Sequence, residues 1–476
     1  MRHLLFVVLS ATFAFFGTVA AQNMPSQLFA FSCSGGFRQT CSNGARPSVL
    51  IQASDGNFYG TAQVSEAGIS NPQGGSIYKI TSAGQFTLLF TFSPGPGNNY
   101  PDGNMPGAAL VEGMDGLLYG TAIFGGANNQ GVVFRIAKNG SGFQVLHHFC
   151  SLANCADGTT PVGLILGKNG MFYGSATLGG AHGFGALFKM TPNGTLTVLH
   201  SLDGVNDAYE PSAIIQGADG NFYGTSHGPD VNGQLFKLTP SGHFTVTHAF
   251  AFEEFAINPL LQASNGNLFG VSDTRSGGQQ LFVMAPSGGG LQSFPSFAPL
   301  AGVSDIPALI EASDGNLWET TFEGGEFNSG SILALSQQGA VMRTFSFNGL
   351  DGALPDARLL QGADGKIYGT ATDGGSVGKG LTANGTVFSL DAGLAPPGAT
   401  IAAFKPGMGM AGAKVTIRGN HMIGTTAVTF NGVNATFTVL NVNFIVATVP
   451  GGASTGPIAV TNPGGTVEST KSFVIR

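Results

Sequence analysis

Charged residues are scarce in this chain: Lys, Arg, Asp and Glu together make up 9% of its 476 residues, and the formal net charge is −7. So low a charged fraction argues against disorder driven by charge repulsion. No stretch is rich in Lys or Arg, so nothing indicates recognition of nucleic acid. Glycine is abundant, with 75 residues, but it does not recur at every third position, which excludes a collagen helix.

Cysteine is also rare, and its four copies form two close pairs, Cys33 with Cys41 and Cys150 with Cys155. Each pair follows a strand-like segment and precedes a loop that leads to a proline. An oxidising, exported environment favours disulfides, so we expect two local disulfides that hold equivalent loops. Metal binding is the alternative, but neither spacing matches a zinc pattern, and we expect no metal or other cofactor.

Residues 1–21 have the pattern of a secretory signal peptide, since Arg2 precedes an apolar core and small residues follow at Val19-Ala20-Ala21. A short transmembrane anchor is the alternative, but the apolar stretch is short for a membrane span. The chain ends in KSFVIR, which is no apolar tail. We therefore expect a secreted protein, extracellular or periplasmic, with no membrane span after the signal is removed.

A nine-residue phrase recurs throughout the middle of the chain. Its seven copies are SDGNFYGTA (Ser54–Ala62), MDGLLYGTA (Met114–Ala122), KNGMFYGSA (Lys168–Ala176), ADGNFYGTS (Ala218–Ser226), SNGNLFGVS (Ser264–Ser272), SDGNLWETT (Ser313–Thr321) and ADGKIYGTA (Ala363–Ala371). Each lies in a unit of about 50 residues with four short, strand-like apolar runs separated by turns. Four strands per unit are typical of a β-propeller blade, so the sequence predicts an all-β, seven-bladed β-propeller over residues 27–391.

The last unit predicts how the ring closes. It has strand-like segments up to GTVFSL (Gly385–Leu390) but no fourth strand, whereas an unassigned strand, QLFAFS (Gln27–Ser32), lies near the N-terminus. Pairing these two segments would complete the last blade and remove an exposed sheet edge. We expect the Asp-Gly pair to supply the turn and the following glycine to allow close approach of backbones. The aromatic residue of each phrase should pack between neighbouring blades.

The repeats resemble a known family. The segments GADGNFYGTS, GANNQGVVFRIAKNG, GAHGFGALFKMTPNGTLTVLHSLDG and GADGKIYGTATDGG are similar to the GloVer tandem repeat of choice-of-anchor bacterial surface and secreted proteins. The resemblance covers about residues 27–391 and departs most in the fifth and sixth units. It implies an exported bacterial chain, and it implies no established activity.

The composition changes after a Pro-rich linker, residues 392–399. Residues 400–476 contain strand-like runs in GAKVTIRGNHM, VTFNG, IVATVPGG and VTNPGGTVES, which resemble the IPT/TIG domain. The resemblance implies an immunoglobulin-like β-sandwich that acts as a spacer or an interaction module.

Catalytic motifs are largely missing. The sequence has no G-x-S-x-G, no phosphate-binding G-x-x-x-x-G-K-[ST] and no H-E-x-x-H. The sixth unit is the exception, because LWETTFEGGE places Trp318, Glu319 and Glu323 close together in sequence, with Glu326 after them. A tryptophan beside carboxylates suits sugar stacking and acid–base chemistry. Drift of a degenerate repeat explains the same residues, and we favour it, while keeping the three residues as candidates for binding.

The longest and most variable connections should lie at one end of the propeller, where the second strand joins the third and the fourth joins the next blade. Variable loops on a rigid scaffold are where binding functions concentrate. We therefore expect a monomeric binding or scaffolding protein that recognises a glycan or an envelope protein through this end. The alternative is a polysaccharide lyase or glycoside hydrolase that acts at the channel mouth.

Overall fold

The computed structural model describes residues 24–34, 38–68, 74–205, 207–227, 233–251, 254–255, 259–274, 279–294, 308–377 and 382–476. The expected signal peptide, residues 1–21, lies outside this part of the chain. The described residues form β-strands and two short 3-10 helices, η1 (Pro96–Asn98) and η2 (Ala153–Cys155). None of the helices in this part is long and apolar enough to cross a membrane.

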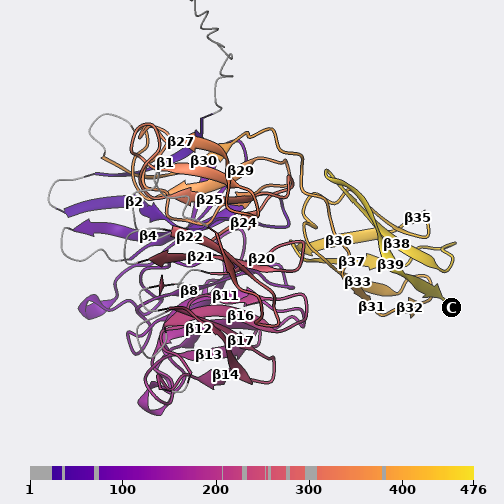
Figure 1. The fold of residues 1–476 in the computed structure, drawn as a ribbon, viewed down its shortest axis with the longest axis horizontal. Helices are drawn as coiled ribbons and strands as arrows, with labels where there is room; N and C mark the ends of the chain where they lie inside the picture. The colour runs from indigo at the N-terminus through magenta and orange to yellow at the C-terminus, as the bar shows by residue number, and fades with distance from the viewer. Residues whose placement is uncertain are drawn as a thin grey trace, which may run out of the picture.

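Seven sheets lie among the described residues up to Leu390, and we call each of them a blade, numbered in the order of the repeated phrase (Figure 1). Blade 1 contains β2 (Arg38–Pro47), β3 (Ile51–Gln52), β4 (Phe58–Gly68), β5 (Ser76–Ile80) and β6 (Phe86–Thr91). Blade 2 contains β7 (Val111–Glu112), β8 (Leu118–Ala122), β9 (Val132–Ile136) and β10 (Gln144–His148). Blade 3 contains β11 (Thr159–Leu166), β12 (Phe172–Leu178), β13 (Ala186–Met190) and β14 (Leu196–Ser201).

The remaining blades repeat this antiparallel order. Blade 4 contains β15 (Ile215–Gln216), β16 (Phe222–His227), β17 (Gly233–Leu238) and β18 (Phe244–Ala249). Blade 5 contains β19 (Glu254–Phe255), β20 (Leu261–Gln262), β21 (Leu268–Thr274), β22 (Gln279–Met284) and β23 (Gln292–Ser293). Blade 6 contains β24 (Ile310–Glu311), β25 (Leu317–Thr321), β26 (Ser331–Leu335) and β27 (Val341–Ser346). Blade 7 contains β28 (Leu360–Gln361), β29 (Ile367–Ala371), β30 (Thr382–Leu390) and β1 (Ser26–Cys33).

Blade 7 confirms the predicted closure of the ring. The N-terminal strand β1 pairs antiparallel with β30, so that Phe29 lies opposite Val387 and Cys33 opposite Thr382. Across the same join, Gly385 lies against the Pro47 ring, and the equivalent pairs Gly131/Pro161, Gly185/Pro211 and Gly330/Pro355 recur between other blades. The join between the last blade and the first therefore has the contacts found elsewhere in the ring.

The repeated phrase encodes a turn that is tied to the aromatic residue. In blade 1 Gly56 has a φ of 80°, which glycine adopts without strain. Asp55 accepts hydrogen bonds from the Asn57 backbone N–H at 3.2 Å and from the Tyr59 hydroxyl at 2.7 Å. The same Tyr-to-Asp bond forms in blades 2, 4 and 7, and Trp318 donates its indole N–H to Asp314 in blade 6.

The aromatic rings of the phrase pack between blades, as expected. Tyr119 of blade 2 lies 4.2 Å from Phe172 of blade 3, measured between ring centroids, and Tyr173 lies at the same distance from Phe222 of blade 4. Across the closure, Tyr368 lies 4.1 Å from Phe58. Each of these blades therefore buries a ring against the next one, around the join as well as within the chain.

The glycine after the aromatic has a different role from the one expected. At Gly120 a Cβ atom would lie 2.5 Å from the Phe134 ring of the third strand, and at Gly60 it would lie 2.5 Å from the Tyr78 hydroxyl. Close approach of backbone is found at Gly174, where Gly163 O would be 2.5 Å away. In all six copies of the phrase that contain this glycine, an aromatic ring of the third strand fills the space that a side chain would occupy.

A further contact joins neighbouring blades, and we call it the latch. The last residue of a first strand accepts a hydrogen bond from a backbone N–H in the Asp-Gly or Asn-Gly turn of the preceding blade, at 2.6–2.9 Å. The donor and acceptor pairs are Ser54–Glu112, Lys168–Gln216, Ala218–Gln262, Ser264–Glu311, Ser313–Gln361 and Ala363–Gln52. Blade 3 has Leu166 at this position and so lacks the acceptor.

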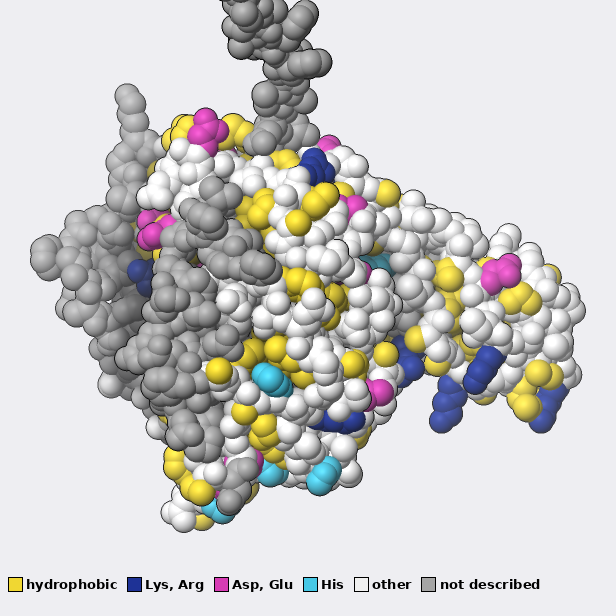
Figure 2. Space-filling view, in the orientation of Figure 1, with side chains coloured by type: hydrophobic (Ala, Val, Ile, Leu, Met, Phe, Trp, Pro, Cys, Tyr) yellow, Lys and Arg dark blue, Asp and Glu magenta, His cyan; other side chains and the backbone are white. Residues whose placement is uncertain are grey.

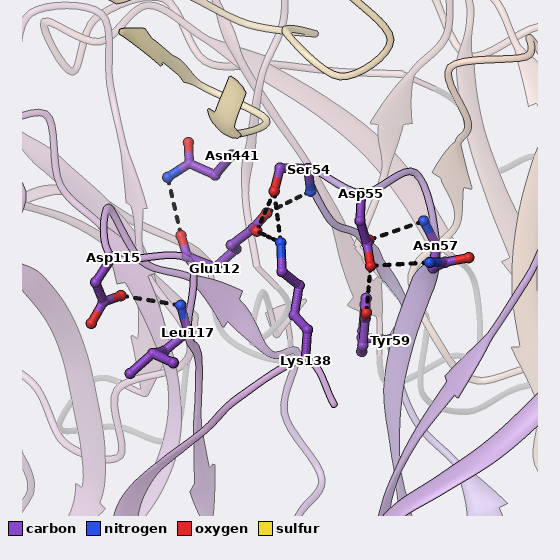
Figure 3. A network of polar contacts seen from close by, with 9 residues as sticks. All are labelled: Ser54, Asp55, Asn57, Tyr59, Glu112, Asp115, Leu117, Lys138 and Asn441. Atoms are coloured by element: carbon purple, nitrogen blue, oxygen red, sulfur yellow. Dashed lines mark hydrogen bonds and ion pairs between the residues drawn. The ribbon is translucent and has the colours of Figure 1, made fainter. Parts of the chain in front are cut away.

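Glutamine and glutamate fill the latch differently. The side-chain N–H₂ of Gln52 also donates to Gly56 O of its own turn at 3.0 Å, and the other three glutamines do the same. A carboxylate cannot donate, and Glu112 instead accepts from the Ser54 hydroxyl at 2.6 Å and forms an ion pair with Lys138 at 2.6 Å (Figure 3). Both versions connect consecutive turns at one end of the propeller.

The C-terminal domain is a sandwich of two sheets around one apolar core. One sheet has the strand order β31 (Ala403–Lys405), β33 (Lys414–Arg418), β37 (Phe444–Thr448), β36 (Thr436–Asn441). The other has the order β32 (Met408–Gly409), β39 (Gly465–Ile475), β38 (Gly456–Asn462), β34 (Ala427–Phe430), β35 (Val433–Asn434). In Figure 1 this domain, drawn in yellow, lies to one side of the blades.

The C-terminal domain rests on the end of the propeller that carries the Asp-Gly turns, which we call the turn end. Asn441 donates to Glu112 O at 3.2 Å in a buried contact (Figure 3). The connecting segment is also held, because Ala395 O accepts from Ser313 at 2.6 Å and from Gln361 at 3.1 Å. On the domain side, Asn462 donates to Pro397 O at 2.9 Å.

The latch predicts a cost for Gln52→Ala. This variant leaves the Ala363 N–H and Gly56 O without their partner at the ring closure. We expect the free energy of unfolding to fall by about 1–3 kcal/mol, because groups that lose a buried hydrogen bond keep their desolvation penalty. Urea unfolding measures this change. Gln85→Ala, at an exposed turn residue, is the control and should stay within about 0.5 kcal/mol of the native protein; equal losses in both variants would contradict the latch.

Candidate functional site

Trp318, the first of the three candidate binding residues, is a core residue. It lies on β25 with no exposed surface, and its ring stacks on Phe345 at a centroid distance of 5.9 Å. The Arg343 guanidinium lies 5.8 Å from the Trp318 ring, and the indole N–H is bonded to Asp314. In this arrangement the indole presents no face to a ligand.

Glu319 is also buried, with 1% of its surface exposed, and neither carboxylate oxygen has a hydrogen-bond partner among the described residues. It occupies the place of the repeat glycine and lies opposite Leu333. In blade 2 the corresponding pair is Gly120 and Phe134. The two changes compensate in volume, since a smaller third-strand side chain leaves room for a larger one on the second strand. Burial raises the pKa of Glu319 to about 8.

Glu323 is exposed, and so is Glu326, in the loop between β25 and β26. Trp318 and Glu319 are neighbours in a strand, so their side chains point to opposite faces of the sheet. The sequence therefore places three residues together that the fold separates. Glycan binding by these residues stays a prediction, and Glu323 is the member of the set that lies at the surface.

Both predicted disulfides are confirmed, Cys33–Cys41 and Cys150–Cys155. The second bridge closes the loop between blades 2 and 3, where Asp157 organises the backbone. Its carboxylate accepts from Ser151 N–H at 3.0 Å and lies 3.0 Å from His147 Nε2. No group of three His, Cys, Asp or Glu side chains suited to a metal ion is found in the described part of the chain.

All seven blades contribute to the lining of the predicted central channel, whose lining residues the sequence did not identify. Its cavity has a volume of about 360 Å³. Each blade contributes the residue that lies three positions before the latch position, at or just before its first strand: Val49, Ala109, Gly163, Ala213, Pro259, Ala308 and Arg358. Six of these are small or apolar, and Arg358 is the exception. Alignment of the seven units on the latch position would have revealed this exception from the sequence.

The end of the propeller opposite the turn end carries the second-to-third and fourth-to-first connections, and we call it the loop end. The exposed phenylalanines of the described residues all lie in second-to-third connections: Phe124 is 39% exposed, Phe184 is 41% exposed and Phe327 is 50% exposed. The fourth-to-first connections add Leu152, Val205 and Leu350. All six side chains come from connections at the loop end, which makes this end a candidate interaction surface.

Charge is sparse over the surface that Figure 2 shows. Acidic, basic and histidine side chains are scattered over the blades, and Lys and Arg gather along one edge of the C-terminal domain.

Family models match both the propeller and the C-terminal domain. The family model described as the Gloeobacter/Verrucomicrobia repeat matches residues 46–280 and 256–395, and the IPT/TIG domain model matches residues 399–475. Among curated proteins, none matches the chain in sequence.

Two solved structures are similar in outline. A fungal alcohol oxidase of the AA5 family, in complex with copper, has 12% identity and a TM-score of 0.48, over 94% of this chain and 100% of the other. A putative oxidoreductase (glucose dehydrogenase) from Thermus thermophilus has 12% identity and a TM-score of 0.40, over 77% and 99%. Neither similarity is close enough to support an argument about this chain.

The buried Glu319 predicts a pH-dependent stability. The pKa of its carboxyl rises from 4.5 to about 8 on folding, so the native state holds a proton that the unfolded chain releases above about pH 4.5. Stability should therefore fall as the pH rises from about 4.5 to 8, by roughly 3–5 kcal/mol. Glu319→Gln should remove most of this dependence, and urea unfolding at pH 5 and pH 8 measures it.

Glu323→Gln is the matched control for this prediction, because Glu323 is exposed in the same blade. It should leave the pH dependence as in the native protein. A native protein that is equally stable at both pH values would contradict the assignment of a protonated Glu319.

Proposed function

The chain belongs to the Gloeobacter/Verrucomicrobia repeat family, and from this premise we propose that it is a secreted bacterial binding or scaffolding protein. Its target is a glycan or another component of the cell envelope, held at the loop end of the propeller. The repeat and the IPT/TIG domain fit a binding or scaffold role. Two disulfides are compatible with an extracellular or periplasmic location.

One observation carries this proposal: Phe124, Phe184 and Phe327 are exposed at the loop end, whereas the aromatic rings of the repeated phrase are buried between blades. Burial of an exposed ring would release apolar surface from water, so these rings are free to gain energy by contact with a partner. An aromatic face also suits the apolar face of a sugar ring.

Two of the fourth-to-first connections at the same end, which carry Leu152 and Val205, are held by local contacts. The Cys150–Cys155 disulfide and the hydrogen bonds that the Asp157 carboxylate accepts from backbone N–H groups fix the connection between blades 2 and 3. In the next connection Asp207 accepts from the Asp203 backbone N–H at 2.8 Å and lies 2.6 Å from His200 Nε2. Loops fixed before binding lose less conformational entropy when a ligand is bound.

A carbohydrate-active enzyme at the channel mouth is the weaker candidate. Hydrolysis of a glycosidic bond uses a pair of carboxylates on either side of the bond. Among the described residues, Asp356 is the single carboxylate that lines the channel cavity. A small and largely apolar lining is what a scaffold requires.

We expect the triple variant Phe124→Ser, Phe184→Ser, Phe327→Ser to lose at least tenfold in affinity for a glycan that the native protein binds. The reason is the loss of apolar contact area, since about 1.4 kcal/mol corresponds to that change. An array of bacterial cell-wall and capsular polysaccharides identifies the ligand, and biolayer interferometry measures the affinity.

Met342→Ser is the control for this experiment. Met342 is 58% exposed, but it lies on the outer strand β27 away from the loops, so its loss should leave binding unchanged. Equal affinities for the native protein and the triple variant would refute the loop-end proposal, as would native protein that binds no glycan on the array.

A further inference from the structure

A second cavity lies at the turn end, between the propeller and the C-terminal domain, and we call it the crevice. Its volume is about 250 Å³. Blades 1, 6 and 7 supply one wall, and His421, Ile423 and Val442 of the C-terminal domain supply the other. Most of its lining is aliphatic, including Leu50, Ile310, Leu359 and Leu360. The crevice and the channel share one residue, Arg358.

Arg358 is the exception among the seven equivalent channel positions, because it is the one that carries a charge. The described residues include no hydrogen bond or ion pair to its guanidinium. Its side chain is exposed, and the protein atoms around it lower its pKa by desolvation. A guanidinium with aliphatic neighbours and no bonded counter-ion among the described residues can attract an anion into the cavity.

Of the two carboxylates near Arg358, Glu311 is hydrogen-bonded to another blade and Asp356 lies outside the crevice. Glu311 faces the crevice, but its carboxylate accepts from the Ser264 N–H at 2.6 Å and from the Ser264 hydroxyl at 2.8 Å. Asp356 lines the channel and does not line the crevice. His421 faces the crevice from the opposite wall and gives it a second hydrogen-bond donor.

We propose that the crevice binds a small organic carboxylate with an apolar body. The Arg358 guanidinium would hold the carboxylate through two parallel hydrogen bonds, the geometry that this group favours, and His421 would donate a further bond. The aliphatic lining would cover the apolar body. Because the two donors come from different domains, the ligand would also join the C-terminal domain to the propeller. This site is at the opposite end from the glycan site and does not depend on it.

Isothermal titration of the full chain with hexanoate tests the proposal. We expect the native protein to bind hexanoate, and Arg358→Gln to bind it at least tenfold more weakly. Hexan-1-ol, which has the same apolar body without the charge, should bind the native protein much more weakly than hexanoate. His421→Gln should give an intermediate loss. Hexanoate should also raise the unfolding temperature of the native protein and leave that of Arg358→Gln unchanged.

Arg135→Gln is the matched control, because Arg135 lies on β9 and donates to Gln144 on the neighbouring strand. Its binding of hexanoate should equal that of the native protein. Three results would overturn the proposal: equal affinity in the native protein and Arg358→Gln, equal affinity for hexanoate and hexan-1-ol, or no hexanoate binding by the native protein at millimolar concentration. None of these depends on whether the loop end binds a glycan.

Discussion

The contact between consecutive Asp-Gly turns is the constraint on which the rest of the molecule depends. At six of the seven joins a turn is bonded to the first strand of the next blade, and the bond from Ala363 to Gln52 connects the turn of blade 7 to blade 1. The pairing of β1 with β30 completes the same join through the backbone. The Cys33–Cys41 disulfide adds a covalent link at this join, between β1 of blade 7 and β2 of blade 1.

Much of this architecture could be predicted from the sequence because it is encoded locally and repeated. Asp-Gly turns, the aromatic that follows and the unassigned strand at residues 27–32 are all visible as patterns. The latch was missed because Gln52 and Glu112 look like ordinary polar residues at strand ends until the neighbouring blade is in place. The role of the glycine was misjudged for a related reason: the ring that covers Gly120 comes from a different strand.

Blade 6 shows why local sequence misleads about sites. The run from Trp318 to Glu323 looks chemically rich, but a strand sends alternate side chains to opposite faces, and both faces of an inner strand are buried in a propeller. Glu319 is tolerated because Leu333 is smaller than the aromatic found in the other blades, so the substitution is explained by packing. Arg358 is the opposite case, since nothing in PDARLLQG marks it out until seven blades are aligned around the channel.

The two ends of the propeller are under different constraints, and this difference explains where variation is found. At the turn end the residues of the repeated phrase have partners in their own blade or the next, and the C-terminal domain rests on these turns. A change there would disturb the ring closure or the domain contact. At the loop end the described connections take no part in the turn-to-strand bonds or in the contact with the C-terminal domain. Their lengths differ, and they carry exposed rings such as Phe184 and Phe327. In such a fold the residues of the loop end can change, and with them the ligand, while the contacts that close the ring stay the same.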